Sequence, residues 1–150
     1  MSQSLVRLIV HVAFSTKGRV PWLTPELRHE LYPYMAKVLE NIQCPAIKIG
    51  GTEDHVHVLC LISRTSTMAG IVEDVKTSTS RWAKTKGPGF SEFHWQNGYG
   101  AFSVSQSAVG RVEEYIAGQE GHHRKVSFQD EFRRFLKQHG VVYDERYVWD

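Results

Sequence analysis

Two histidines, His55 and His57, stand one residue apart in the apolar segment HVHVLCLI at residues 55–62. The apolar and β-branched residues of this segment predict a strand, in which alternate side chains share a face and lie about 6.6 Å apart. Two imidazoles at this spacing can converge on one divalent metal ion. Two ligands do not make a complete site, so the pair alone favours the ordinary interpretation, in which one histidine is a hydrogen-bonded core residue and the other lies at a strand edge.

Further along the chain, the segment VEEYIAGQEGHH offers a third ligand and a nucleophile. Tyr115 and Gln119 are four residues apart, which on a helix puts them on one side and one turn apart. The apolar residues Val109, Val112 and Ile116 mark the buried stripe of this helix, so the pair lies on its flank. A glutamine oxygen can bind a hard metal ion, and a tyrosine hydroxyl beside a metal can act as a nucleophile. The alternative is an ordinary half-buried tyrosine and a surface glutamine.

The elements that must position these residues can be predicted from periodicity and capping signals. Thr24 before Pro25 indicates a helix start, because a hydroxyl can cap free amides and proline suits the first turn. Ser127 with Asp130 resembles a capping box for a last helix, and Pro33 is expected to bend the first one. The predicted strands are residues 5–14, 45–51, 55–62 and 101–105. The predicted helices are residues 25–42, 67–84, a third from about residue 107, and 128–139.

This order predicts an α+β fold of the ferredoxin-like β-α-β-β-α-β type, followed by two further helices. Its helices should cover one face of an antiparallel sheet and leave the other face for a ligand or partner. The 150 residues suit a single domain over residues 1–150. Two cysteines and no signal-peptide or membrane-spanning pattern indicate a cytoplasmic setting, and a net charge of +2 is too small to demonstrate a nucleic-acid partner.

Four segments in this order resemble the HUH endonucleases, and among them the small single-tyrosine transposases that include the REP-associated tyrosine transposases. HVAFSTKGR at residues 11–19 looks like the N-terminal signature of that family, and EDHVHVL contains its His-hydrophobe-His motif. WQNGYGAFSVS resembles the segment that leads into the tyrosine helix, and EYIAGQ matches the tyrosine motif with Tyr115 and Gln119. The resemblance covers most of the chain.

The resemblance implies a metal-dependent transposase that cuts and rejoins single-stranded DNA, with element ends that contain hairpins. His55, His57 and Gln119 would hold a divalent metal, Mg²⁺ or Mn²⁺, which suits their nitrogen and oxygen atoms. Tyr115 would attack the scissile phosphate to give a 5′-phosphotyrosine and a free 3′-hydroxyl, followed by strand transfer. The family also implies a homodimer, in which the tyrosine helix could act in its own chain or in the partner chain.

Single-stranded DNA requires positive charge for its backbone and flat side chains for its bases. His11 should lie near the histidine pair, because the first and third strands of this fold are neighbours. Other basic and aromatic residues follow the first strand and the second helix. His122, His123, Arg124 and Lys125, directly after the tyrosine helix, are interpreted as a basic patch for phosphates rather than as metal ligands. The predicted DNA contacts are His11, Lys17, Arg19, Arg81, Lys84, Trp95, His122, Arg124 and Lys125.

Three other functions stay open at this point. A non-catalytic RRM-like module would stack bases on its sheet, but it leaves Tyr115 and Gln119 unexplained. A domesticated nuclease would keep the chemistry without mobility, and a metal hydrolase would use water and need no tyrosine.

Overall fold

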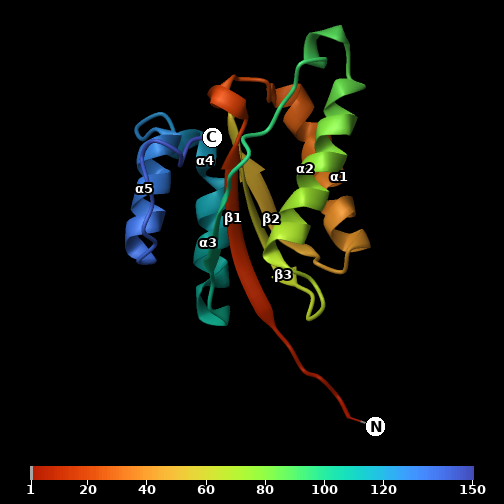
Figure 1. The fold of residues 1–150 in the computed structure, drawn as a ribbon, viewed down its shortest axis with the longest axis vertical. Coiled ribbons are helices and arrows are strands. Elements are labelled where there is room, and N and C mark those ends of the chain that lie inside the picture. Colours follow the sequence, from red (N-terminus) through yellow and green to blue (C-terminus); the bar gives the residue numbers. More distant parts are fainter. Residues whose placement is uncertain (1) are drawn as a thin grey trace.

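In the computed structural model, which describes residues 2–150, four antiparallel strands form one sheet (Figure 1). The spatial order is β2-β3-β1-β4, as the ferredoxin-like arrangement requires. The predicted fold class is therefore confirmed. The strands are β1 (Leu8–Ser15), β2 (Ala46–Gly51), β3 (His55–Ile62) and β4 (Gly100–Ser103).

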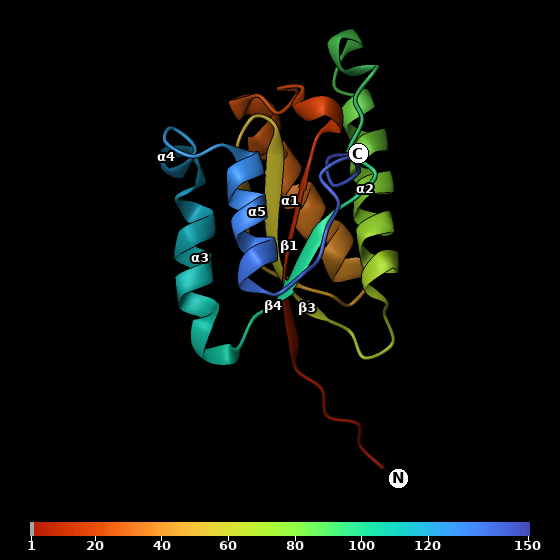
Figure 2. The same ribbon diagram turned by 60° about the vertical axis from the view of Figure 1, so that its left-hand side comes forward.

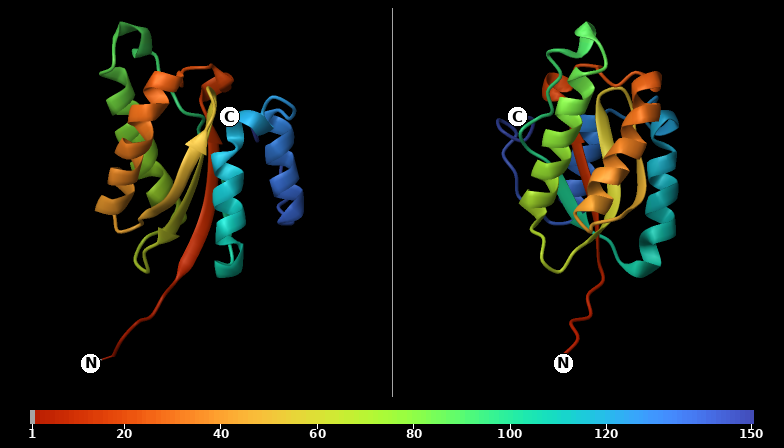
Figure 3. Two further views of the ribbon diagram at one scale, coloured as in Figure 1. Left: turned by 180° about the vertical axis from the view of Figure 1, so that it is seen from behind. Right: turned by 90° about the vertical axis from the view of Figure 1, so that its right-hand side faces the viewer.

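Helices cover both faces of this sheet (Figures 1 and 3). Two long helices pack against each other on one face, and a C-terminal group of three covers the other. The first face carries α1 (Pro25–Asn41) and α2 (Met68–Lys84); the second carries α3 (Val109–Ala117), α4 (Gln119–His122) and α5 (Phe128–Gln138). Short 3₁₀ turns occur at Lys17–Arg19, Pro88–Phe90 and Gln106–Ala108.

The predicted helix starts are confirmed by their caps. The Thr24 hydroxyl accepts a hydrogen bond from the Leu27 amide at 3.2 Å, and the Ser127 hydroxyl accepts one from the Asp130 amide at 3.1 Å. α1 continues through Pro33 as one helix. The prediction of the second helix at residues 67–84 agrees with α2, whereas β1 begins three residues later than predicted.

Successive side chains of β3 point to opposite faces of the sheet, and both faces are buried. Val56, Val58 and Cys60 point into the main apolar core beneath α1 and α2. The opposite face carries the histidines and is covered by α3 and α5. The prediction that this second face stays available was therefore wrong. The reason is that α3 and α5 have apolar stripes of their own, including Ile116 and Phe132, which are buried against the sheet.

The segment after α5 runs back along the β4 side of the sheet (Figure 2). It is held there by the Gly98 amide, which donates to the Asp150 carbonyl at 2.8 Å, and by Trp149, whose ring packs against Phe132. At the other terminus, residues 2–7 extend away from the sheet. Among residues 2–150, no helix is long and apolar enough to span a membrane.

Candidate active site

The second face of the sheet forms the floor of a buried polar site. His11 comes from β1, and His55 and His57 come from the neighbouring β3. Their side chains are almost inaccessible to solvent, with exposed fractions of 3%, 0% and 0%. The predictions that His55 and His57 share a face and that His11 lies beside them are confirmed by this geometry.

His55 is held by acceptors on both of its ring nitrogens. Its Nδ1 lies 2.7 Å from Oδ1 of Asp54 and 3.0 Å from the Thr52 hydroxyl, which assigns the Nδ1 proton to a hydrogen bond with the carboxylate. Its Nε2 then presents a lone pair. That lone pair faces Oε1 of Gln119, another acceptor, at 3.0 Å. Two lone pairs at this distance repel each other unless a cation lies between them, either a second imidazole proton or a metal ion.

His57 is held in a different way. Its Nδ1 shares a hydrogen bond of 2.7 Å with Nε2 of His11, and its Nε2 lies 2.8 Å from Oε1 of Glu131. Burial first, and then the positive charge that His57 can carry, lowers the pKa of His11 to about 3. His11 is therefore neutral at pH 7. A neutral His11 can serve either tautomer of His57, because its Nε2 can donate or accept.

Glu131, which sequence reasoning missed, is the centre of this network. Its side chain is completely buried and accepts hydrogen bonds from Nε2 of Gln119 at 3.1 Å and Nε2 of His123 at 3.1 Å, in addition to those from His57 and the Tyr115 hydroxyl. Burial alone would raise the pKa of this carboxyl, but its donors, above all His123 and His57, hold the pKa far below the ordinary range. Glu131 is therefore an anion with four donors.

The donor set fits a divalent cation. Ligand atoms of His55, His57, His123 and Glu131, here called the histidine–glutamate cluster, all lie within 4.8 Å of one another. The opposed lone pairs of His55 and Gln119 give a further reason. Two ligand atoms that bind one ion at about 2.1 Å and at a right angle are about 3.0 Å apart, and the atoms of His55 and Gln119 lie at this separation. The Asp54 carboxylate on the far nitrogen of His55 is the outer partner that metal-binding histidines usually have.

The Tyr115 hydroxyl lies at the edge of this cluster. It donates a hydrogen bond to Oε2 of Glu131, accepts one from the Arg134 guanidinium at 3.1 Å, and lies 3.3 Å from Nε2 of His122. Burial first, and then the bond to the Glu131 carboxylate, raises the pKa of Tyr115, while the charge of Arg134 opposes this increase. The phenol is therefore protonated in the resting site.

A break in the helix brings Tyr115 and Gln119 together. α3 ends at Ala117, and Gly118 leaves the helical conformation before α4 begins at Gln119. Both side chains nevertheless reach the buried polar groups of the same chain, Gln119 at His55 and Tyr115 at Glu131. α3 also approaches β2 closely at Gly50, where a Cβ atom would lie only 2.7 Å from the Ile116 carbonyl oxygen. Glycine at this position lets the tyrosine helix lie directly on the sheet.

The predicted DNA contacts fall into separate regions. Lys17 and Arg19 occupy the turn after β1, and Arg81 and Lys84 lie on the outer side of α2. Lys17, Arg81 and Lys84 are exposed. His122 is half-buried beside Tyr115, while Arg124 and Lys125 are exposed in the turn after α4. His11 is only 3% exposed and lies beneath the cluster, so it supports the site from below.

Two interpretations of single residues were wrong. Trp95, expected among the DNA contacts, is only 4% exposed, packs edge-on against Phe14 and Phe93, and donates to the Thr79 hydroxyl at 2.9 Å. Trp95 therefore belongs to the core. The sequence could not show this, because a tryptophan in a glycine-rich segment looks the same whether it is buried or exposed. His123, interpreted as part of a phosphate-binding patch, instead faces the cluster.

Comparisons with known proteins support the resemblance. The family model of the IS200-like transposases matches residues 4–119. A protein from Deinococcus radiodurans R1 assigned as a transposase has a similar structure, with a TM-score of 0.62 and 20% identity over 79% of this chain and 98% of its own. A REP-associated tyrosine transposase bound to a REP hairpin has a TM-score of 0.61 and 12% identity, over 96% of this chain and 91% of its own.

The search of curated protein sequences gave no significant match. The two structural similarities are below 25% identity and therefore bear on the fold alone, whereas the family match spans most of the sequence. Its matched region includes both histidines of β3, Tyr115 and Gln119. The chain belongs to the family of IS200-like transposases.

Proposed function

We propose that this transposase cuts and rejoins single-stranded DNA through a covalent bond to Tyr115, in a reaction that depends on a divalent metal. The observation that carries the proposal is the position of the Tyr115 hydroxyl, which lies against the histidine–glutamate cluster and bonds to Glu131 and Arg134. A nucleophile, a proton acceptor and a metal-binding donor set thus meet within one chain.

The reaction can be written with the groups present. The Tyr115 oxygen attacks the scissile phosphorus, and the bond from phosphorus to the 3′-oxygen breaks. As the new bond forms, the tyrosine proton becomes strongly acidic and passes to Oε2 of Glu131, which already accepts its hydrogen bond, and the departing 3′-oxygen takes a proton from solvent. The products are a 5′-phosphotyrosine and a free 3′-hydroxyl. Since the ester bond is kept, another 3′-hydroxyl can attack its phosphorus and release its own proton to solvent. The bond from phosphorus to the Tyr115 oxygen then breaks, and Glu131 returns the proton to that oxygen.

His55 and His57, together with Gln119 or Glu131, would hold the metal, and their mixed nitrogen and oxygen atoms suit Mg²⁺ or Mn²⁺. A bound ion would supply positive charge to polarise the scissile phosphate. His11 keeps His57 in place through its 2.7 Å hydrogen bond, and Asp54 does the same for His55. The homodimer implied by the family stays a prediction.

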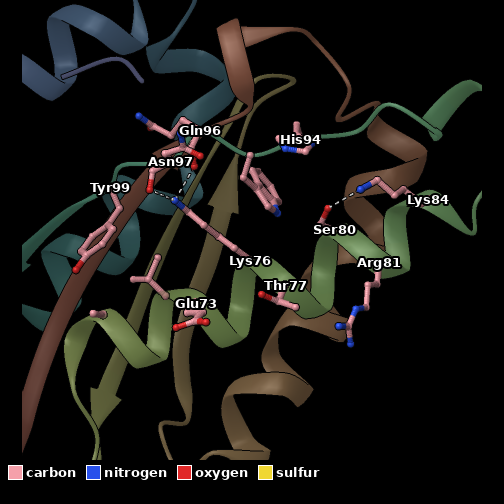
Figure 4. Close-up of a pocket in the computed structure, with 13 residues that line it drawn as sticks. Glu73, Lys76, Thr77, Ser80, Arg81, Lys84, His94, Gln96, Asn97 and Tyr99 are labelled. Atoms are coloured by element: carbon pink, nitrogen blue, oxygen red, sulfur yellow. Dashed lines mark hydrogen bonds between the residues drawn. The ribbon is translucent and has the colours of Figure 1, made fainter. Parts of the chain in front are cut away.

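The DNA strand has a candidate path along α2 (Figure 4). A groove of about 500 Å³ separates this helix from residues 94–99. Lys76 fixes the far wall, because its Nζ donates to the carbonyls of Gln96 and Gly98, both at 2.7 Å. On the rim, Arg81 and Lys84 have no carboxylate within 4.0 Å among residues 2–150. A groove with unpaired positive charge suits the backbone of an unpaired strand.

The groove is connected to the catalytic side through the turn after β1. The Lys17 amide donates to the His94 carbonyl at 2.8 Å, and the Thr16 amide donates to the Asp54 carbonyl at 2.8 Å. His94 lines the groove and Asp54 supports His55. A strand that leaves the groove over this turn passes Lys17 on its way to the site. One structural relative was solved with a REP hairpin, and we extend hairpin-containing DNA to this chain as the substrate.

Charge reversal in the groove should weaken DNA binding. We expect Arg81→Glu with Lys84→Glu to lower the affinity for a single-stranded oligonucleotide at least tenfold at about 0.1 M salt, and to flatten its salt dependence, because two phosphate contacts are lost. Fluorescence anisotropy in EDTA measures binding without cleavage. Lys37→Glu with Arg64→Glu makes the same change in net charge outside the groove and should leave the affinity within about threefold. Equal losses in both double variants would contradict the groove.

The RRM-like alternative requires a sheet face on which bases can stack. That face is covered here by α3 and α5 and holds buried polar groups, so the fold argues against it. A metal hydrolase would share the metal site but would form no covalent product. A domesticated nuclease would share both the metal site and the covalent product but would not move DNA.

A covalent product in a metal-dependent reaction tests the proposal. The protein is incubated with end-labelled single-stranded hairpin DNA and Mn²⁺, and the mixture is resolved on a denaturing protein gel. We expect a labelled band at the mass of protein plus DNA that EDTA abolishes and that Mn²⁺ or Mg²⁺ restores. Cleavage without a covalent band would favour the water-dependent hydrolase. Binding without any cleavage, over a range of hairpins and metals, would favour a non-catalytic module.

A further inference from the structure

A cavity of about 420 Å³ opens between α3 and α5 directly beside the tyrosine. Its wall on α3 includes Arg111 and Tyr115, and its wall on α5 includes Arg134 and Gln138. The volume is in the range of ordinary ligand pockets. Unlike the buried histidine–glutamate cluster, this cavity leads from solvent to the nucleophile.

Arg134 is the residue of this cavity that contacts the hydroxyl of the proposed nucleophile. Its Nη2 donates to the Tyr115 hydroxyl at 3.1 Å, and its guanidinium carbon lies 6.0 Å from the centre of the Tyr115 ring and 5.8 Å from that of Phe135. The guanidinium therefore rests against two rings and reaches the oxygen that would attack phosphorus. A donor at this position is also near the phosphate oxygens once the bond between oxygen and phosphorus forms.

Arg134 forms no ion pair with a carboxylate in the part of the chain that the structure describes. Among residues 2–150, no carboxylate oxygen lies within 4.0 Å of its guanidinium, and the same holds for Arg111. Its neighbour Arg133 is the opposite case, with Glu145 at 2.6 Å and Asp130 at 3.0 Å. Two unpaired guanidinium groups in one cavity, one of them on the nucleophile, favour an anionic ligand with several oxygens.

We propose that this cavity binds the phosphodiester backbone of the strand being cut, and that Arg134 is a catalytic residue that stabilises charge on the transferring phosphate. Arg111 then contacts a neighbouring phosphate of the same strand. The inference rests on the proposed function and adds a group to its reaction. As the bond from the Tyr115 oxygen to phosphorus forms and the bond to the 3′-oxygen breaks, Arg134 stays protonated and donates to a phosphate oxygen that does not take part in either bond.

The test compares Arg134→Gln with Arg133→Gln in single-turnover formation of the covalent complex at saturating DNA and Mn²⁺. We expect Arg134→Gln to slow the reaction by about 100-fold, as loss of a charge-stabilising donor does elsewhere. DNA affinity should change by less than about threefold, because one phosphate contact contributes little to total binding. Arg133→Gln should react within about twofold of the original rate, since its charge is already paired and its contacts are exposed.

A neutral substrate separates catalysis from structural support. A methylphosphonate at the scissile position has a methyl group in place of one charged oxygen. The wild-type protein and Arg134→Gln should cut it at rates within about threefold of each other, because the charge that Arg134 stabilises is absent. An undiminished 100-fold deficit on this substrate would indicate that Arg134 only supports the fold, and would overturn the assignment.

Failure of the inference can be distinguished from failure of the proposed function. If the wild-type protein forms the covalent complex and Arg134→Gln forms it as fast as Arg133→Gln does, the role of Arg134 is wrong and the proposed function stands. If the wild-type protein forms no covalent complex with any hairpin substrate, both are overturned together.

Discussion

Replacing Tyr115 with phenylalanine should abolish the covalent protein–DNA complex, with a loss of at least about 1,000-fold in the rate of cleavage. The change removes one oxygen, and that oxygen is the nucleophile. The donor atoms of His55, His57 and Gln119 are untouched, so binding of Mn²⁺ should be preserved. The free energy of unfolding should fall by only about 1 kcal/mol, because the Glu131 carboxylate loses one of its four donors. The measurement is the labelled band on a denaturing gel, with Mn²⁺ affinity from calorimetry.

Tyr32→Phe is the matched control. The Tyr32 hydroxyl is buried in α1 and has no hydrogen-bond partner among residues 2–150. Removing it should leave cleavage unchanged and should not destabilise the protein, because an unsatisfied buried hydroxyl is costly. A covalent band that persists in Tyr115→Phe would assign the nucleophile to another residue. Loss of the band in both variants would indicate a structural effect.

The part of the site that comes from regular elements could be predicted from the sequence. Strand alternation places His55 and His57 on one face, and the neighbouring positions of the first and third strands bring His11 to them. Four-residue spacing likewise indicated that Tyr115 and Gln119 act together. Their joint action stays a prediction, but the structure does bring both side chains to the histidine–glutamate cluster. The helix breaks at Gly118, and the short α4 still points Gln119 at His55.

The remainder depends on the packing of α5, which local periodicity does not determine. Glu131 follows a predicted N-cap in a helix with an apolar stripe, where an acidic residue in the first turn is ordinarily explained by the helix dipole. Its burial appears only when α5 lies across the histidine face of the sheet. His123 was missed for the same reason, since its orientation depends on the turn between α4 and α5. The clearest available signal was the number of histidines close to Tyr115 in the sequence.

Glu131→Gln should slow formation of the covalent complex by about 100-fold, the size expected when a general base is removed. Glutamine keeps the shape of the side chain but cannot take the tyrosine proton, and its amide nitrogen would meet donors from His123 and Tyr115. Stability should also fall, by about 2–4 kcal/mol at pH 7, because several buried donors lose their anionic acceptor. Asp130→Asn is the control, since this neighbour is exposed and its one ion pair among residues 2–150 is with Arg133, and it should change neither quantity appreciably.

The pH dependence of stability distinguishes the buried anion from ordinary packing. The folded pKa of Glu131 lies below its ordinary value of 4.5, so the unfolded chain binds this proton more readily as the pH falls. The stabilisation from the carboxylate is therefore complete above pH 4.5 and is lost as the pH falls through the folded pKa. Urea unfolding of the wild-type protein and Glu131→Gln should show the largest difference at pH 7 and a smaller one below pH 4.5. A constant difference from pH 7 to pH 3, or faster cleavage by Glu131→Gln, would contradict the role of Glu131 as a buried anion that accepts the tyrosine proton.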